Sequence, residues 1–272
     1  MSDVARDTRG DEVCAAADGG AAHPNLRAQL SLDDRRVPPV VTALAARLRP
    51  GADPEPLWRN QLGGLTVALG DAVLKHVPAS VLRDHPREPT PLDEAERLTW
   101  IGDHHPVPRV LDAGADDDGQ WLVTARIDAT TAVAERWRAA PRATVRALGV
   151  ALRRLHDVLP VDGCPWRLPD ALLADTPAHD LVVSHGDACA PNTLLDARGH
   201  FAAHVDLGAL TVADRHLDLA VGLQSLEWNY GPGWEAEYLA SYGLDADPAR
   251  LAHWRAWWNS GGAESRSADS EP

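Results

Sequence analysis

The stretch Ser184–Asn192 reads SHGDACAPN, and a second stretch further along the chain, His204–Gly208, reads HVDLG. The apolar run that ends at Ser184 predicts a strand, so the first stretch is expected to follow it as a polar loop. Gly199 lies between the apolar runs Thr193–Leu195 and His204–Leu207, a pattern that predicts a β-hairpin. The chain therefore places polar loops around one short hairpin.

Three side chains of these loops have a spacing that suits phosphoryl transfer. Asp187 and Asn192 are five residues apart, and Asp206 stands two residues before Gly208. A protein-kinase catalytic loop uses this order: an Asp that receives the proton of the acceptor hydroxyl, an Asn, and then a metal-binding Asp ahead of a Gly. Mg²⁺ prefers hard oxygen ligands, which the Asn192 amide and the Asp206 carboxylate supply. We therefore interpret Asp187 as the catalytic residue and Asn192 and Asp206 as Mg²⁺ ligands.

A lysine, a glutamate and a glycine pair upstream extend this pattern. Lys75 is the single lysine among 26 Lys and Arg residues, and it lies in a predicted strand, Ala72–His76. A kinase uses such a lysine to bind the α- and β-phosphates, and a glutamate on the next helix pairs with it. Glu94 occupies that place in the predicted helix Pro91–Ile101. Gly63-Gly64 predicts a turn between strands that would cover the phosphates.

Each of these residues also has an ordinary structural explanation. A single Asp or Asn is most often a turn or cap residue, a single Lys on a strand is mostly a surface residue, and a Glu in the first turn of a helix mostly complements the helix dipole. Here all of them occur in one chain and in the right order. The combination favours a kinase-type site over a set of unrelated turn and surface residues.

Composition limits the class of protein and of partner. The chain has 272 residues and a net charge of −14, which argues against nucleic acid or an anionic membrane as partner and suits a cationic ligand. No run of 18 apolar residues is present, and the polar N-terminal residues lack the apolar stretch of a signal peptide. The three cysteines are too few and too scattered for a disulfide framework or a metal knuckle. We expect a soluble cytoplasmic protein.

P-loop, dinucleotide-binding and nucleophile-elbow motifs are all missing from the sequence.

The order of the predicted elements indicates an α+β fold. Short strands and one helix dominate the first half, and a stripe of Val145, Leu148, Leu152 and Leu155 opens a mostly helical second half. A β-rich lobe followed by a helical lobe leaves a cleft between the two. Val107–Leu111 is predicted as a further strand. We expect a partly disordered N-terminal segment over residues 1–55 and a β-rich, nucleotide-binding lobe over 56–127. A helical catalytic and substrate lobe is expected over 128–260, followed by a disordered tail over 261–272.

From about Trp58 to Gly243 the chain resembles the aminoglycoside phosphotransferases, kinase-fold enzymes that inactivate antibiotics. The resemblance is carried by Ser184–Asn192, by Val205–Gly208 and by Ala213–Ala220, which reads ADRHLDLA. It implies a bilobal protein-kinase-like fold, ATP and Mg²⁺ as cofactors and a cationic aminoglycoside as partner. It also implies that the linker Thr124–Ile127 presents its backbone, at Ala125 and Ile127, to adenine. Two further residues, Arg215 and Asp218, would brace the region behind the catalytic loop.

The chain departs from the family members that act on kanamycin and neomycin. Those relatives carry a long helical insert before the catalytic loop, whereas only some 20 residues separate Pro165 from His185 here. Their acidic C-terminal segment is replaced by Trp254–Trp258, which reads WRAWW. The resemblance therefore implies the branch that phosphorylates the 3″-hydroxyl of streptomycin. The two guanidinium groups of streptomycin would attract carboxylates such as Asp157 and Glu227, and Trp228 could stack on one of them.

Alternative functions remain at this stage. Within the superfamily, a kanamycin or neomycin 3′-phosphotransferase and a choline- or homoserine-type kinase share the same core motifs. Two His-x-Asp pairs, His185 with Asp187 and His204 with Asp206, could instead form a metal site of a hydrolase. That arrangement would leave Lys75 without a role. A silent binding module of kinase shape is disfavoured because its Lys, Asp and Asn are all present.

Overall fold

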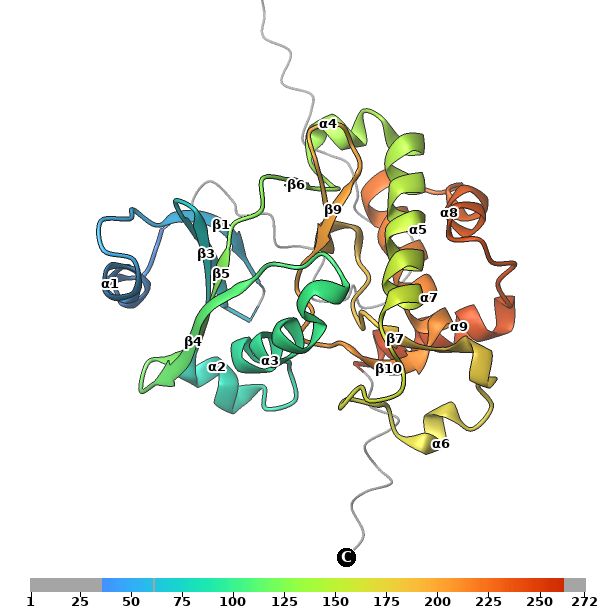
Figure 1. Cartoon of the computed structure of the whole chain (residues 1–272), viewed down its shortest axis with the longest axis horizontal. Helices are drawn as coiled ribbons and strands as arrows, with labels where there is room; N and C mark the ends of the chain where they lie inside the picture. The colour runs from blue at the N-terminus through green and yellow to red at the C-terminus, as the bar shows by residue number, and fades with distance from the viewer. Residues whose placement is uncertain (1–35, 61, 262–272) are drawn as a thin grey trace, which may run out of the picture.

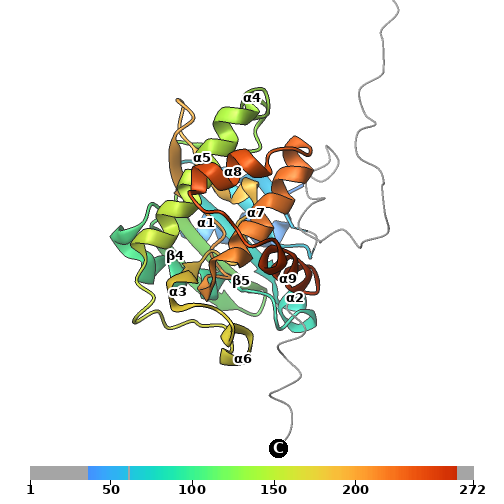
Figure 2. The same ribbon diagram turned by 90° about the vertical axis from the view of Figure 1, so that its right-hand side faces the viewer.

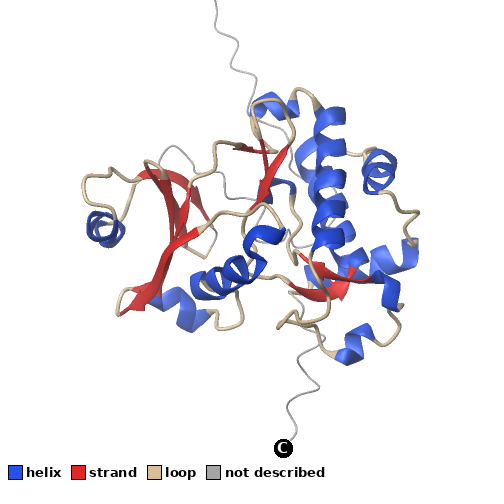
Figure 3. Ribbon diagram, in the orientation of Figure 1, coloured by secondary structure: helices blue, strands red, loops and turns tan. Residues whose placement is uncertain are grey.

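The structure is a computed structural model, and it describes residues 36–60 and 62–261. Figure 1 shows a β-rich lobe and a helical lobe side by side, and Figure 3 shows how strands and helices divide between them. This arrangement confirms the predicted α+β layout. The disorder predicted for the N-terminal residues and the tail falls almost entirely on residues 1–35 and 262–272, outside the described residues. Along the described ranges no helix has both the length and the apolar character needed to cross a membrane.

The N-terminal lobe is built on an antiparallel sheet with the strand order β1-β2-β3-β5-β4. The bounds of its elements are α1 (Pro39–Leu48), β1 (Glu55–Arg59), β2 (Leu65–Leu69), β3 (Ala72–Pro78), α2 (Ala79–Asp84), α3 (Pro91–Ile101), a 3₁₀ turn (Gly102–His104), β4 (Val110–Asp116) and β5 (Gly119–Ala125).

The two faces of this sheet are covered by different helices, because side chains alternate along a strand. Leu74 of β3 and Val123 of β5 pack with Leu44 of α1 on one face. On the other face, Leu122 packs with α3, and Lys75 lies opposite Leu122 in the register of β3 and β5. The period-2 pattern therefore directs the lone lysine to the face that meets α3.

Helix α3 begins with a strong start signal. The Thr90 hydroxyl accepts a hydrogen bond from the Asp93 amide while the Asp93 carboxylate accepts one from the Thr90 amide, which forms a capping box. Pro91 follows at the first helical position, where a missing N–H costs nothing. The helix start is therefore fixed by its own sequence, which sets where Glu94 projects in the first turn.

The C-terminal lobe consists of helices around two small sheets, one of β7 and β10 and one of β6, β8 and β9. Figure 2 shows α5, α7, α8 and α9 from the side of this lobe. The bounds of its elements are β6 (Thr130–Thr131), α4 (Glu135–Arg138), α5 (Pro141–Val158), α6 (Asp170–Leu173), a 3₁₀ turn (Ala178–Asp180), β7 (Leu181–Ser184), a 3₁₀ turn (Ala190–Asn192), β8 (Thr193–Leu195), β9 (Phe201–His204), β10 (Thr211–Asp214), α7 (Arg215–Tyr230), α8 (Glu235–Tyr242) and α9 (Pro248–Asn259).

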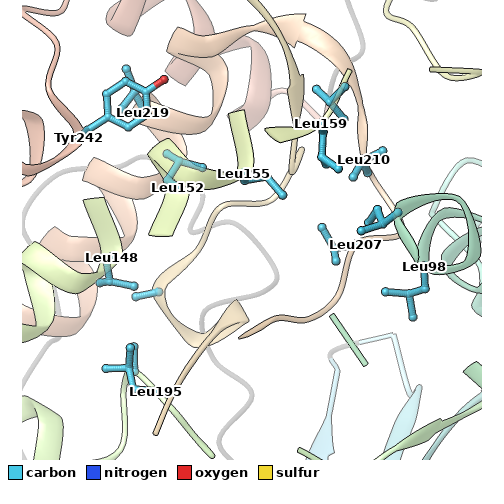
Figure 4. Packing of buried hydrophobic residues seen from close by; sticks show 14 of the residues in the cluster. Leu98, Leu148, Leu152, Leu155, Leu159, Leu195, Leu207, Leu210, Leu219 and Tyr242 are labelled. Atoms are coloured by element: carbon cyan, nitrogen blue, oxygen red, sulfur yellow. The ribbon is translucent and has the colours of Figure 1, made fainter. Parts of the chain in front are cut away.

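The main apolar core lies along α5 and continues into the N-terminal lobe. The predicted stripe of α5 is buried, and it packs with Leu219 of α7 and Tyr242 of α8. Figure 4 shows this cluster extending through Leu207 and Leu210 to Leu98 of α3. The two lobes therefore share one continuous core at the point where α3 meets the segment after β9.

Two strand predictions are wrong in their position. The strand expected over Val107–Leu111 is β4, which begins at Val110 and runs to Asp116, because it pairs with β5 as far as a tight turn at Asp117-Asp118. The second hairpin strand, expected over His204–Leu207, ends at His204. Asp206 has a φ of 61°, which no extended strand accepts, so the chain leaves the hairpin there.

Removing a buried side chain of α5 should destabilise the protein far more than removing an exposed one. Leu155 is fully buried, whereas Val150 on the same helix has 55% of its surface exposed. We expect Leu155→Ala to lower the free energy of unfolding by about 2–5 kcal/mol, since it leaves a cavity. The matched variant Val150→Ala should stay within about 0.5 kcal/mol of the wild type. Urea unfolding followed by far-UV circular dichroism measures both, and equal losses would show that α5 does not pack as described.

Candidate active site

The loop after β7 is held in place by a buried carboxylate beneath it. Asp218 of α7 accepts hydrogen bonds from the backbone amides of His185, at 2.6 Å, and Gly186, at 3.0 Å. Its side chain also bonds the His156 ring at 2.9 Å. Gly186 has a φ of 81°, and a Cβ there would overlap the carbonyl oxygen of Ala209, so no other residue fits without displacement. The loop thus presents Asp187 in one fixed direction.

The His185 ring joins this loop to the segment that contains Asp206. Its Nδ1 accepts a hydrogen bond from the Asp187 amide at 3.3 Å, and its Nε2 donates to the Val205 carbonyl at 3.1 Å. A ring that accepts at Nδ1 and donates at Nε2 is the neutral Nε2–H tautomer. His185 is fully buried, so this neutral ring acts as a spacer between the two polar loops.

Asp187 has one oxygen engaged and one without a partner. The Asn192 side-chain amide donates to the Asp187 carbonyl at 2.9 Å and to its Oδ2 at 3.0 Å. Oδ1 is buried and has no hydrogen-bond partner among the described residues. Burial raises the pKa of Asp187, and the charge of Asp206 raises it further. Such an oxygen is suited to accept a hydrogen bond from a hydroxyl that enters the site.

Lys75, Glu94 and Asp206 form an ion cluster between the two lobes. The Lys75 ammonium donates to Asp206 Oδ1 at 2.7 Å and to the Glu94 carboxylate. Burial alone would lower the pKa of Lys75, but the charges of Asp206 and Glu94 outweigh it and raise that pKa above its ordinary value. Lys75 in turn lowers the pKa of Asp206, so the two groups stay oppositely charged.

Asp206 combines exposure with an unusual backbone. Among the described residues it is the single non-glycine residue with a positive φ, and 54% of its side chain is exposed. Asp tolerates the left-handed region better than most residues, yet the conformation still costs free energy that the surroundings must offset. The backbone turn directs a half-exposed carboxylate toward Lys75 and away from the hairpin.

The predicted nucleotide contacts from the first lobe lie at the ends of β2 and β5. Gly63 has a φ of 98°, and the Gly64 amide donates to the Asn60 side chain at 2.6 Å, which closes a turn between β1 and β2. The Ala125 amide at the end of β5 is already bonded to the Arg109 carbonyl at 2.8 Å. Ile127 follows in the segment between the lobes, where its carbonyl accepts from Ala129. Adenine contacts at Ala125 and Ile127 stay a prediction.

With this geometry in place, comparison with known proteins identifies the class. A profile of the phosphotransferase enzyme family matches residues 51–175 and 161–254. The chain belongs to this family.

Among its relatives in this family is an aminoglycoside 3′-phosphotransferase of Streptomyces fradiae, 35% identical over 60% of this chain and 76% of the relative. A streptomycin 3″-kinase of Streptomyces griseus is 33% identical over 58% of this chain and 75% of the relative. An aminoglycoside phosphotransferase of Streptomyces rimosus, solved with ADP and streptomycin, superposes with a TM-score of 0.61 at 25% identity, over 82% of this chain and 98% of that one. The predicted family and kinase-like fold are confirmed.

The family assignment also removes the hydrolase alternative. His204 bonds the His105 ring at 2.9 Å, and His185 bonds backbone groups, so neither imidazole is directed at a shared ligand position. Within the described ranges, no group of three or more His, Cys, Asp or Glu side chains is arranged to hold a metal ion. Burial lowers the pKa of His105 to about 3, which keeps this histidine neutral inside the core.

The residues predicted to bind the acceptor are engaged with C-terminal lobe partners. Asp157 bonds Arg153 one turn earlier on α5 at 2.8 Å, and Glu227 of α7 bonds Arg255 of α9 at 2.6 Å. Trp228 packs against Trp258, with ring centroids 6.2 Å apart. Their role toward an acceptor stays a prediction.

The sequence missed several supporting residues of the site. Ser225 of α7 accepts a hydrogen bond from the Ala190 amide at 2.9 Å and thereby supports the far end of the catalytic loop. His156 donates to Asp218 and bonds the Tyr242 hydroxyl at 2.7 Å. A lone Ser or His on a helix gives no signal of its own, so contacts to loops distant in sequence were needed to find these two.

Alanine at Gly186 should be much more costly than alanine at another glycine of similar φ. Gly51 has a φ of 84° and open space where a Cβ would lie, so Gly51→Ala should cost only the left-handed backbone penalty, about 1–2 kcal/mol. Gly186→Ala adds an overlap with the Ala209 backbone, so we expect a larger loss of stability together with loss of phosphotransferase turnover. Chemical unfolding of the two variants measures the difference, and equal losses would contradict the described packing of the loop.

Proposed function

We propose that this chain is an ATP-dependent O-phosphotransferase that inactivates an aminoglycoside antibiotic, with the 3″-hydroxyl of streptomycin as the acceptor. The observation that supports the reaction type most is the meeting of Lys75, Glu94 and Asp206 next to Asp187 and Asn192. Residues far apart in the sequence converge there in the arrangement that phosphoryl transfer from a nucleotide requires.

The residues present fit a bound Mg²⁺. The Asn192 side-chain nitrogen is occupied by Asp187, which leaves its amide oxygen as a ligand atom. Asp206 adds a half-exposed carboxylate of low pKa, and both groups are hard oxygen donors. When bound, Mg²⁺ neutralises charge on the β- and γ-phosphates of ATP. We expect Asn192 and Asp206 to hold it.

The chain's own residues account for the remaining chemistry. Lys75 is held by Glu94 with its ammonium near Asp206, and it would bind the phosphates of ATP. Asp187 Oδ1 would accept the hydrogen bond of the acceptor hydroxyl and fix its oxygen in line with the γ-phosphorus. As the acceptor oxygen bonds the γ-phosphorus and the bond from that phosphorus to ADP breaks, the hydroxyl proton would pass to Asp187. Asn192 and His185 hold the Asp187 carboxylate and backbone during this step.

A cationic acceptor suits the charge of the chain and the substrates named for its relatives. With a net charge of −14, the protein attracts polycations. The 3″-kinase of Streptomyces griseus and the streptomycin complex from Streptomyces rimosus support streptomycin. A 3′-phosphotransferase activity on kanamycin or neomycin is the second candidate, because the Streptomyces fradiae relative has that regiochemistry and a similar identity.

Asp187→Asn should abolish most turnover while it preserves the fold. The amide keeps the size of the carboxylate but cannot accept the hydroxyl proton, so we expect kcat to fall by roughly 10²–10⁴-fold. Calorimetric binding of Mg²⁺-ADP should change little, because Asn192 and Asp206 remain. Steady-state kinetics with ATP and streptomycin measures the loss, and wild-type kcat in the variant would remove Asp187 from the catalytic role.

The pH profile gives an independent check on the same residue. Asp187 must be ionised to accept a proton, and its pKa is raised by burial. Protonation therefore begins at a higher pH than for an ordinary carboxyl group, and kcat should decline on the acid side from that higher pH. The residual activity of Asp187→Asn should lack this limb. A limb that persists unchanged in the variant would assign the titration to another group.

A panel of acceptors decides the regiochemistry. We expect streptomycin to gain one phosphoryl group, about 80 Da, in the presence of Mg²⁺ and ATP, with kanamycin and neomycin poor or inert. Mass spectrometry of the product, with proton–phosphorus NMR to locate the ester, reads the outcome, and Asp187→Asn serves as the matched inactive control. Equal turnover of kanamycin would favour the 3′ candidate. Phosphorylation of choline or homoserine alone would preserve the reaction type and discard the antibiotic.

A further inference from the structure

Arg97 is a mostly buried arginine on α3, three residues after Glu94. Only 13% of its side chain is exposed. Its Nε donates to the Leu210 carbonyl at 3.0 Å, and one Nη donates to the Asp93 carbonyl of its own helix at 3.1 Å. The Asp93 carboxylate is 3.8 Å away and half exposed, so most of the bonding of this buried cation goes to backbone carbonyls. Desolvating a guanidinium is costly, which makes this placement unusual for a residue without a role.

One end of the Arg97 contact is the segment that contains Asp206. The Leu210 amide bonds the Leu207 carbonyl at 3.0 Å, so Asp206 and Leu210 belong to one compact turn. Leu207 and Leu210 are fully buried and lie beside Leu98 of α3 (Figure 4). Those apolar contacts hold the segment against α3, but they are not directional. The hydrogen bond from Arg97 is directional, so it fixes the position of the segment along the helix.

The other end of the contact is Trp166 of the C-terminal lobe. The Arg97 guanidinium lies over this ring, with its Cζ 4.6 Å from the centroid, and Trp100 of α3 packs edge-on to the same ring. The Trp166 carbonyl accepts a hydrogen bond from the Val212 amide of β10 at 2.8 Å. The backbone of Trp166 is therefore attached to β10, the strand that follows Leu210. Arg97 bridges the helix, the Asp206 segment and this strand.

We propose that Arg97 is a positioning residue, which sets the distance between the two carboxylates that Lys75 binds. Glu94 is on α3, Asp206 is at the start of the turn that Arg97 bonds, and Lys75 donates to both. The inference rests on the proposed phosphotransferase function. It goes beyond that function because the contacts of Arg97 are with Leu210, Asp93 and Trp166, so it acts through Glu94 and Asp206.

Four variants separate positioning from stability. Arg97→Met removes the donor and the charge while it keeps the aliphatic length. Arg97→Lys keeps the charge and one donor but has no planar face for the ring. Trp166→Phe keeps an aromatic face. Arg47→Met is the matched control, since Arg47 also lies over a tryptophan ring, Trp121, at 4.9 Å and bonds an Asp, on the side of the first lobe that α1 covers.

The readouts are the Kd for Mg²⁺-ADP by calorimetry, kcat and the acceptor KM by steady-state kinetics, and Tm. We expect Arg97→Met to lower kcat by about 10- to 100-fold and to raise the Kd for Mg²⁺-ADP by about tenfold, with the acceptor KM within about twofold, because a small misplacement of catalytic groups has effects of this size. Arg97→Lys should show smaller losses in both parameters, and Trp166→Phe, which keeps an aromatic face for Arg97, the smallest losses. Arg47→Met should leave both parameters within about twofold of the wild type.

The experiment distinguishes a failure of the role of Arg97 from a failure of the proposed phosphotransferase function. Wild-type kcat and Kd in Arg97→Met with a lowered Tm would make Arg97 a residue of stability only and would overturn the proposal. A wild type that binds Mg²⁺-ADP but phosphorylates no aminoglycoside would contradict the acceptor alone, and the Kd of Arg97→Met would still decide the role of Arg97. A wild type that binds no Mg²⁺-ADP would overturn both.

Discussion

The geometry of the site depends on the hydrogen bonds that the Asp218 carboxylate accepts. It is fully buried, and it accepts hydrogen bonds from the His156 ring and from the amides of His185 and Gly186. Burial alone would raise the pKa of Asp218, but the hydrogen bonds from the His156 ring and the Ser184 side chain outweigh it and lower that pKa, so the group stays ionised inside the core. A buried charge is tolerated only where its hydrogen bonds are satisfied, and here the bonds that satisfy it also fix the backbone before Asp187. Stability and site geometry therefore have the same physical origin.

A second constraint is the repulsion between acidic groups in one small space. Besides burial, the charge of Asp206 raises the pKa of Asp187 and also that of Glu94, the third carboxylate nearby. Lys75 lowers the pKa of Asp206 by direct contact, while the partners of Asp187 are the uncharged side chains of Cys189 and Asn192. The two aspartates consequently differ: one is kept ionised by a cation, and the other has a raised pKa. The ionised Asp206 suits a metal ligand, and Asp187 with its raised pKa suits a proton acceptor.

The parts that could be predicted from the sequence are those encoded by local pattern or by motif spacing. The α3 bounds follow from Thr90, Pro91 and the helical periodicity, and the pairing of Lys75 with Glu94 follows from motif order and is present in the structure. The end of β9 could not be read from apolar residues, because Val205 and Leu207 continue the strand pattern while the backbone turns at Asp206. Arg97, His156 and Ser225 escaped notice for a different reason. Their contacts with Leu210, Asp218 and the Ala190 amide join residues at least 35 positions apart in the chain, and no local pattern records such contacts.

The structure gives a physical reason for the lone lysine. In a chain with 26 basic residues of which one is lysine, Lys75 stands where two carboxylates from different lobes approach one point. An ammonium has three donors that point in different directions, so it can bond Glu94 and Asp206 and retain one N–H for a phosphate oxygen. A guanidinium presents its donors in one plane and needs more room, and only 26% of the Lys75 side chain is exposed. Arginine would satisfy the charge at this position but not the geometry.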